Sequence, residues 1–148
     1  MTRILAVASG GGHWEQLMRL RDAFDGPDTL FATTNPDLPK QAGIARAAHL
    51  PDCNRDSLLR SVGCLFAALF LVLRFQPQVI VSTGAAPGLL CILCGRLIGA
   101  RTLWIDSVAN AEKLSMSGEL ARRFAHVCLT QWPHLARPDG PHHAGAVL

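Results

Sequence analysis

The stretch Ile4-Leu5-Ala6-Val7-Ala8-Ser9-Gly10-Gly11-Gly12-His13 decides the fold, because an apolar strand runs directly into a glycine-rich turn. A helical pattern begins immediately afterwards, at Trp14. Glycines let the backbone adopt positive φ angles and let a ligand approach closely. The amino terminus of the next helix presents unpaired N–H groups and the positive end of its dipole, which favours a phosphate. The junction predicts either a phosphate cradle or an ordinary β-to-α turn of an α/β domain.

Two familiar nucleotide-binding motifs do not match this junction. The dinucleotide fingerprint G-x-G-x-x-G needs a glycine where this chain has Glu15, and a carboxylate at the end of the second strand. The second predicted strand, 29–33, runs instead into Thr34 and Asn35. A P-loop needs Gly-Lys-Ser/Thr after the turn, and none follows. The turn by itself therefore leaves the identity of the phosphate open.

The composition is that of one domain with an apolar character. The 148 residues are 49% hydrophobic and 17% charged, which favours contact with a membrane surface or a large partner interface. The formal net charge is +3, and among the fourteen basic residues only Lys40 and Lys113 are lysines. Arginine suits bidentate contact with phosphate. Because the chain has no long basic run, we expect no nucleic-acid partner.

The five cysteines are odd in number and lie mostly in apolar runs, which indicates reduced thiols in a cytoplasmic protein. Cys91 and Cys94 have C-x-x-C spacing inside an apolar helical stretch, so we expect buried hydrophobic side chains rather than zinc or redox chemistry. No secretory signal is recognised before the first strand. His142 and His143 lack a partner pattern of carboxylates or cysteines, and we expect no metal site.

The most membrane-like stretch is 62–73, which Arg60 and Arg74 bracket. Twelve apolar residues reach only about 18 Å, short of the ~30 Å hydrocarbon core, so we predict that the stretch does not span a bilayer. Because it is apolar nearly all round, it should be buried in protein or lie partly in a bilayer interface. Both alternatives remain open, and the candidate membrane residues are Arg60, Phe66, Phe70 and Arg74.

Strand-like and helix-like segments alternate along the chain. The expected strands are 4–8, 29–33, 47–50, 79–81, 102–105 and 126–129, and the expected helices are 14–24, 56–75, 88–98 and 118–125. Short, continuously apolar strands in this order predict a Rossmann-like α/β fold, a parallel sheet with helices on both faces. We expect the domain to cover 1–137, with 138–148 a linker or tail in which residues 144–148 begin one more strand.

The glycine-rich and polar loops should gather at one edge of this sheet, because ligands bind outside the carboxyl ends of parallel strands. The first loop is Ser9–His13, and the second is Ser82–Gly88, with Pro87 near the start of its helix. The third begins at Asp106-Ser107 and extends through Asn110, Glu112, Ser115 and Ser117-Gly118. Two glycine loops that each open a helix at one crevice predict a diphosphate, or a phosphate joined to a sugar.

These motifs carry a resemblance to known families. Ser9–His13 with Glu15-Gln16-Leu17 resembles the opening motif of bacterial PssD-type polysaccharide biosynthesis proteins. It is also similar to that of the membrane-anchoring subunit of the eukaryotic GlcNAc transferase that adds the second sugar of the N-glycan lipid precursor. The stretch 79–135 resembles the same family through its motifs at 82–88, 105–107, 114–118 and 131–133. More distantly, the layout resembles the amino-terminal half of the peptidoglycan lipid-intermediate GlcNAc transferase.

The resemblance implies the amino-terminal half of a GT-B glycosyltransferase, a subunit that is inactive without a separate donor-binding partner. This half would bind a polyprenyl-diphosphate-linked saccharide in exopolysaccharide or capsule synthesis, while the partner mainly holds the UDP-sugar; no cofactor would be tightly bound. The eukaryotic subunit carries an amino-terminal transmembrane helix that this sequence lacks, so we expect a cytoplasmic protein peripheral to the inner face of the cytoplasmic membrane. The implied acceptor and phosphate contacts are Ser9, Gly10, Gly11, Gly12, Thr83, Gly84, Ala85, Gly88 and Ser107.

Sugar transfer requires a base for the acceptor hydroxyl. His13 is the preferred candidate, because it lies at the helix-opening loop and a histidine ordinarily titrates at about pH 6.5. A phosphate contact or a structural role remains its alternative. Glu15 and Asp106 are reserve catalytic candidates, although a carboxylate in the first turn is also favoured by the helix dipole, and related bacterial sequences commonly have Glu in place of Asp106. The rival hypothesis for the whole chain is a non-catalytic nucleotide- or phosphate-binding regulatory module.

Overall fold

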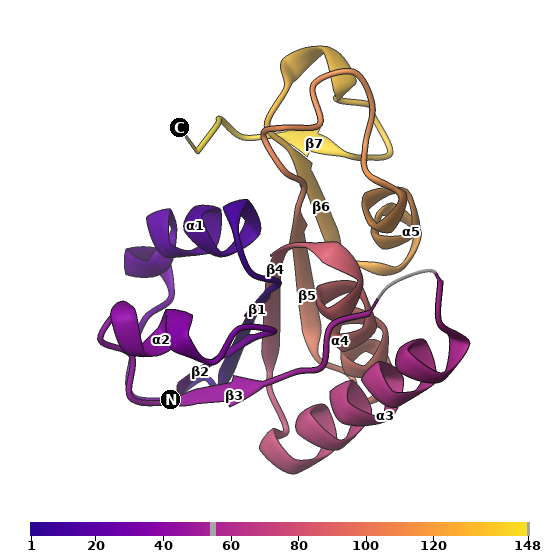
Figure 1. Cartoon of the computed structure of the whole chain (residues 1–148). Helices are drawn as coiled ribbons and strands as arrows, with labels where there is room; N and C mark the ends of the chain where they lie inside the picture. Colours follow the sequence, from indigo (N-terminus) through magenta and orange to yellow (C-terminus); the bar gives the residue numbers. More distant parts are fainter. Residues whose placement is uncertain (54–55, 148) are drawn as a thin grey trace.

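Seven parallel strands form one sheet in the computed structural model, which describes residues 1–53 and 56–147 (Figure 1). The strands are β1 (Ile4–Ala8), β2 (Thr29–Thr33), β3 (Ala47–His49), β4 (Val79–Gly84), β5 (Arg101–Ile105), β6 (Val127–Thr130) and β7 (His142–His143). Their order in the sheet is β3-β2-β1-β4-β5-β6-β7, and every pairing is parallel. The predicted Rossmann-like parallel sheet is confirmed.

Helices cover both faces of the sheet, as predicted. The helices are α1 (Gly12–Arg19), α2 (Asp37–Gln41), α3 (Leu58–Phe75), α4 (Ala85–Leu97) and α5 (Met116–Phe124), with 3-10 turns at Arg21–Ala23 and Pro133–Leu135. Figure 1 shows α1 and α2 on one side of the sheet and α3, α4 and α5 on the other. This division follows from the right-handed crossovers that parallel strands require.

Each face of the sheet has its own hydrophobic core. On the α1 side, Trp14 and Leu17 pack with Phe31 of β2. On the other side, buried side chains of α3 and α4 pack with the strands and with Trp104, which is fully buried. Strands β2 and β3 extend the sheet on one side of β1, and strands β4 to β7 extend it on the other. The helices that follow the neighbouring strands β1 and β4, which are α1 and α4, therefore lie on opposite faces of the sheet. This arrangement opens a crevice at the carboxyl edge.

Helix α3 is the part of the fold that the described chain covers least. Only Cys64, Ala68 and Val72, spaced four residues apart, are buried, whereas Phe66 and Phe70 are 64% and 68% exposed. The helix has 18 residues and is apolar enough to cross a membrane by length and composition alone, which is weak evidence for a span. The length argument made for residues 62–73 does not extend to the whole helix, because apolar residues from Leu58 onward lengthen it, and the absence of a span stays a prediction.

The cysteines depart from the prediction in one respect. Cys53 and Cys64 form a disulfide, with their Cα atoms 6.1 Å apart, so the expectation that all five thiols are reduced was wrong. The inner stripe of α3 places Cys64 against the loop that carries Cys53, within the usual distance for a disulfide. Cys91, Cys94 and Cys128 are free and buried, as expected. Burial raises the pKa of Cys128 to about 12, which keeps this thiol protonated and unreactive.

Several element boundaries also differ from the prediction; helix α1, for example, ends at Arg19 rather than at position 24. Strand β4 continues to Gly84, so α4 begins at Ala85 rather than at position 88. The last strand, β7, is His142–His143 and pairs with β6, so it falls in the expected linker and before the expected strand at 144–148. Gly145 adopts a φ of 110°, which does not continue a strand.

Candidate functional site

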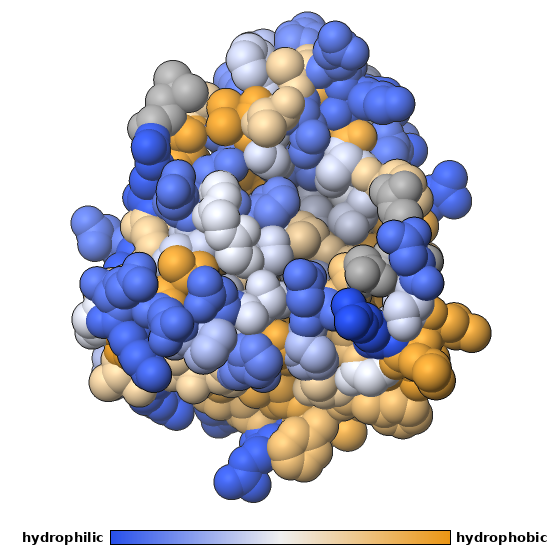
Figure 2. Space-filling view, in the orientation of Figure 1, coloured by the Kyte–Doolittle hydropathy of each residue, from blue (hydrophilic) through white to orange (hydrophobic). Residues whose placement is uncertain are grey.

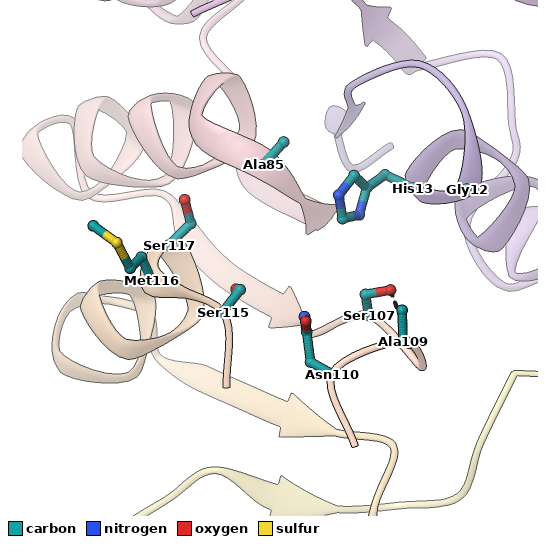
Figure 3. A pocket seen from close by; sticks show the side chains of 9 residues that line it. All are labelled: Gly12, His13, Ala85, Ser107, Ala109, Asn110, Ser115, Met116 and Ser117. Carbon is teal, nitrogen blue, oxygen red and sulfur yellow. Dashed lines mark hydrogen bonds between the residues drawn. The ribbon is translucent and has the colours of Figure 1, made fainter. Parts of the chain in front are cut away.

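A cavity of about 370 Å³ lies at the carboxyl edge of the sheet, where α1, α4 and α5 begin (Figure 3). It is lined by Gly12, His13, Ala85, Ser107, Ala109, Asn110, Ser115, Met116 and Ser117. None of these lining residues carries a carboxylate. Unpaired N–H groups at helix starts, with hydroxyl and amide side chains beside them, favour an anionic ligand such as a phosphate.

His13 is fixed at the cavity wall by a reciprocal pair of hydrogen bonds to the end of β4. Its Nδ1 lies 3.2 Å from the carbonyl oxygen of Thr83, and the Thr83 hydroxyl donates to the His13 carbonyl oxygen at 2.6 Å. A carbonyl oxygen only accepts, so Nδ1 must carry the proton in this bond. In the neutral imidazole, Nε2 then has the free lone pair, which is the state that a general base requires.

The backbone beside His13 has two unusual conformations. Gly84 has a φ of 146°, and a Cβ at this position would overlap the His13 imidazole. Only glycine therefore permits both the backbone and the ring to lie where they do. Ala85 follows with a φ of 71°, although it is not a glycine, and its side chain lines the cavity. Strained residues of this kind, which cost about 1–3 kcal/mol each, cluster at functional sites.

Asp106 supports the cavity from behind and does not line it. Its buried carboxylate accepts hydrogen bonds from Trp104 Nε1 at 3.1 Å and from Asn110 Nδ2 at 3.1 Å. Ser115 donates to the same carboxylate through its backbone N–H at 3.1 Å and its hydroxyl at 2.7 Å. The Ser115 oxygen also caps α5 by accepting from Gly118 N at 2.9 Å. Asp106 thus holds the β5–α5 loop and the start of α5 against the cavity.

Two buried glutamines form a part of the site that the sequence did not reveal. Gln16 of α1 donates to Ser107 Oγ at 3.1 Å and accepts from Val108 N at 3.3 Å. Gln131 Nε2 donates both to Gln16 Oε1 at 2.5 Å and to the Asp106 carbonyl at 3.0 Å. These amides join α1 to the loop after β5 and to the end of β6. Both glutamines belong to motifs that carry the family resemblance, at 15–17 and 131–133, but the sequence predicted no role for either side chain.

The structure brings together part of the predicted acceptor site. Gly12, His13, Ala85 and Ser107 line the cavity, whereas Ser9, Gly10, Gly11, Thr83, Gly84 and Gly88 do not. The Gly10 N–H donates to Thr34 Oγ1 at 3.1 Å, toward β2. Gly88 packs against Ser82 below the cavity, where a Cβ would overlap the serine hydroxyl. The glycine loops therefore shape the cavity more than they line it.

The reserve candidate Glu15 and Trp132 of the 131–133 motif lie outside the cavity. Glu15 is exposed and lines a separate hollow with Trp14 and Arg19, away from His13. Trp132 donates from its indole N–H to the Val108 carbonyl at 2.8 Å, so it packs on the loop after β5. The start of α5 also brings Met116 and Ser117 to the cavity; Ser117 belongs to the third predicted loop, but neither residue was among the predicted contacts. Among the described residues, no group of three His, Cys, Asp or Glu side chains is placed to hold a metal ion.

Comparison with solved structures identifies the fold. MurG from Acinetobacter baumannii superimposes with a TM-score of 0.75 and 12% identity, over 97% of this chain and 45% of MurG. UDP-GlcNAc 2-epimerase from Neisseria meningitidis, solved with UDP-GlcNAc, gives a TM-score of 0.65 and 9% identity, over 87% of this chain and 40% of the enzyme. The chain thus spans less than half of each enzyme, and it has the fold of one Rossmann-like half of a GT-B protein.

The chain belongs to the family described as "Oligosaccharide biosynthesis protein Alg14 like", whose model matches residues 28–146. Among curated proteins it is similar to UDP-N-acetylglucosamine transferase subunit ALG14 of Yarrowia lipolytica, at 25% identity over 90% of this chain and 75% of that protein. The mouse protein of the same name is also 25% identical, over 90% of this chain and 76% of its own length. The predicted resemblance to this subunit, and the prediction of a glycosyltransferase subunit, are confirmed at the level of the family. The PssD-type assignment stays a prediction.

Proposed function

We propose that the chain is the acceptor-binding, membrane-associating subunit of a two-component glycosyltransferase that moves GlcNAc from UDP-GlcNAc to a polyprenyl-diphosphate-linked saccharide. Exopolysaccharide or capsule synthesis is the proposed setting. The cavity is the observation that carries the proposal, because it combines three helix starts, a positioned imidazole and a lining without carboxylates. The names of the family relatives support the choice of donor.

The division of labour is supported by what surrounds the first glycine turn. Strand β2 ends at Thr33, and Thr34 and Asn35 follow, so no carboxylate stands there to bind a donor ribose. The curated relatives are named as subunits of a UDP-N-acetylglucosamine transferase, which supports a partner that supplies the other half of the enzyme. We therefore assign the diphosphate of the acceptor to this cavity and the UDP-sugar mainly to the partner.

In the proposed reaction, the acceptor hydroxyl oxygen attacks the anomeric carbon of the sugar, and the bond from that carbon to UDP breaks. The UDP leaves with the electron pair, and the hydroxyl proton passes to Nε2 of His13. The Thr83 carbonyl stabilises the resulting imidazolium, because it already accepts from Nδ1. The starts of α1, α4 and α5 stabilise the acceptor diphosphate. Asp106 and Glu15 have no direct part: Asp106 positions the loop, and Glu15 is remote.

His13→Ala is the variant that tests the base. We expect a fall in kcat of at least about a hundredfold with unchanged binding of the partner subunit, since general-base catalysis contributes about 10²–10⁴-fold. Glu15→Gln, which alters an exposed side chain on the same helix, is the matched control and should retain the wild-type rate. An unchanged kcat in the His13 variant would remove this residue as the base.

Membrane association is assigned to the outer surface of α3. The exposed side chains of Phe66 and Phe70 would enter the interface of the cytoplasmic membrane from its inner face, and Arg60 and Arg74 would meet anionic head groups. Phe66→Ser with Phe70→Ser should release the chain from anionic vesicles. Retention of the double variant on such vesicles would contradict this assignment.

Direct binding separates this function from a nucleotide-binding regulatory module. The purified chain is titrated with inorganic pyrophosphate and with UDP-GlcNAc in a calorimeter. We expect pyrophosphate to bind and UDP-GlcNAc to bind no more tightly than pyrophosphate, because the nucleoside has no site on this subunit. Tight binding of UDP-GlcNAc to the chain alone would favour the regulatory module and contradict the split enzyme.

A further inference from the structure

Most exposed large apolar side chains of the described residues lie in the helical layer formed by α3, α4 and α5. Apart from Met1, every large hydrophobic side chain that is exposed among the described residues lies on α3, α4, α5 or the first residue of β6. Figure 2 shows apolar side chains gathered at the lower right and bottom of the molecule, where Figure 1 draws α3. Helix α4 packs against both α3 and α5. Because all three helices carry exposed apolar side chains, the apolar surface is larger than the part of α3 assigned to the membrane.

Helix α5 carries an apolar stripe of its own. Met116, Leu120 and Phe124 are spaced four residues apart and therefore lie along one side of the helix. Their exposed fractions are 59%, 44% and 47%, although side chains of this size are usually covered. The helix packs on the rest of the fold through Gly118 and Ala121 instead. The α5 stripe, defined as these three side chains, thus has no cover in the described chain.

The position of the α5 stripe relates it to the cavity. Met116, at the first turn of α5, is one of the residues that line the cavity (Figure 3). From there the stripe runs to Phe124 at the other end of the helix, over about 12 Å at 1.5 Å per residue. Beyond that end, Leu97 of α4 is 82% exposed, in the same layer as α3. The α5 stripe therefore begins at the cavity and lies in the same helical layer as the surface assigned to the membrane.

The flank of the α5 stripe limits what can cover it. Glu119, one residue from Leu120 and so about 100° around the helix, pairs with Arg122 at 3.3 Å, and Arg122 also pairs with Asp139 at 3.8 Å. The apolar strip is one side chain wide, whereas a stable protein interface needs a broader apolar centre. A single flexible apolar chain whose anionic head lies in the cavity matches both the width and the position.

We propose that the α5 stripe binds the isoprenoid tail of the lipid-linked acceptor, next to the diphosphate held in the cavity. This inference rests on the proposed function and adds a site for the part of the acceptor that carries no sugar. Met116 is the junction, because it contacts the cavity and begins the stripe. The acceptor tail would then pass along α5 toward the bilayer that α3 contacts.

Two water-soluble probes separate the head from the tail: inorganic pyrophosphate and farnesyl diphosphate, each titrated without vesicles and below micelle formation. We expect the wild-type chain to bind farnesyl diphosphate at least about tenfold more tightly than pyrophosphate, because apolar burial strengthens binding. Leu120→Ser with Phe124→Ser should abolish most of this advantage and leave pyrophosphate binding unchanged, which also shows that the variant is folded. Leu58→Ser with Leu59→Ser on α3, at sites of 81% and 86% exposure, is the control and should keep the advantage.

The outcomes distinguish the tail site from the proposed function. Equal affinity of the wild-type chain for the two probes, or an undiminished advantage in the α5 double variant, would overturn the tail site and leave the diphosphate site standing. Failure of both probes to bind would overturn the diphosphate site and the tail site together. Loss of vesicle binding in the α5 double variant with no farnesyl advantage in the wild type would assign the stripe to the bilayer and overturn the inference.

Discussion

The substitution Gly84→Ala perturbs the placement of the proposed base more directly than any other single change. Gly84 lies at the end of β4 with a φ of 146°, and its Cα faces the His13 imidazole. A methyl group built there would be 3.0 Å from Cγ of the ring and closer still to two other ring atoms. Carbon atoms do not pack at such distances, so the ring or the strand must move.

The expected cost has two parts. A non-glycine residue at this φ is strained by about 1–3 kcal/mol. Displacement of the ring also breaks the bond between His13 Nδ1 and the Thr83 carbonyl, which contributes about 0.5–1.5 kcal/mol. We therefore expect Gly84→Ala to lower the free energy of unfolding by about 2–4 kcal/mol. The strain arises in the backbone at position 84, whereas the lost hydrogen bond is one that the His13 ring makes.

A double-mutant cycle with His13→Ala separates these parts. Unfolding is followed in urea, in one buffer, for the wild type, the two single variants and the double variant. In the double variant the ring is absent, so the overlap is gone and the backbone strain remains. Its loss of unfolding free energy should therefore be smaller than the sum of the two single losses by about 1 kcal/mol. Additive effects would refute the placement of the His13 ring against Gly84.

Three further changes test other parts of the structure. Asp106→Asn should lower the free energy of unfolding, measured in urea, by about 2–3 kcal/mol. One acceptor oxygen of the buried carboxylate becomes an NH₂ donor that faces other donors. An effect as small as that of the exposed Glu15→Gln would contradict the supporting role of Asp106. Reduction of the disulfide between Cys53 and Cys64, which are 11 positions apart in the sequence, should lower the free energy of unfolding by about 3 kcal/mol and lower Tm. The Tm of a Cys53→Ala variant should not respond to the reductant. An equal Tm of the wild type with and without reductant would argue against the pairing. Burial raises the pKa of Cys128 from 9.0 to about 12, so the stabilising contribution of this thiol is complete below pH 9.0 and is lost as the pH rises toward 12. Cys128→Ala should therefore reduce the fall in unfolding free energy over this pH range. Identical pH profiles of the wild type and the variant would contradict the burial.

The sheet could be predicted from the sequence because its strands are short apolar runs that break at glycine or polar residues. Ile4–Ala8 and Thr29–Thr33 were predicted to the residue, since both are buried strands with sharp ends. The interior of α3 was also predicted, whereas its exposure was only one of two alternatives that the sequence left open. Apolar composition has the same appearance in a core helix and a surface helix, and only the three-dimensional packing shows that a single stripe of α3 is covered.

The site was predicted less completely, because it depends on contacts between distant parts of the chain. Position relative to strand ends was enough to predict that Gly12, His13, Ala85 and Ser107 lie together. It did not reveal that Asp106 is turned inward by donors on its own loop. The pairing of Gln16 with Gln131, 115 residues apart, follows no local period either. Sequence patterns thus identified the edge of the sheet that holds the site, and side-chain packing determined which residues reach it.

Reconstitution of the transfer reaction tests whether the acceptor and donor sites are divided between two subunits. The chain is incubated with labelled UDP-GlcNAc and a polyprenyl-diphosphate-linked saccharide, first alone and then with the donor-binding subunit, and label in the lipid fraction is counted. We expect no transfer by the chain alone, transfer with the partner, and loss of that transfer with His13→Ala. Transfer by the chain alone at the rate of the pair would contradict the division of acceptor and donor sites between two subunits.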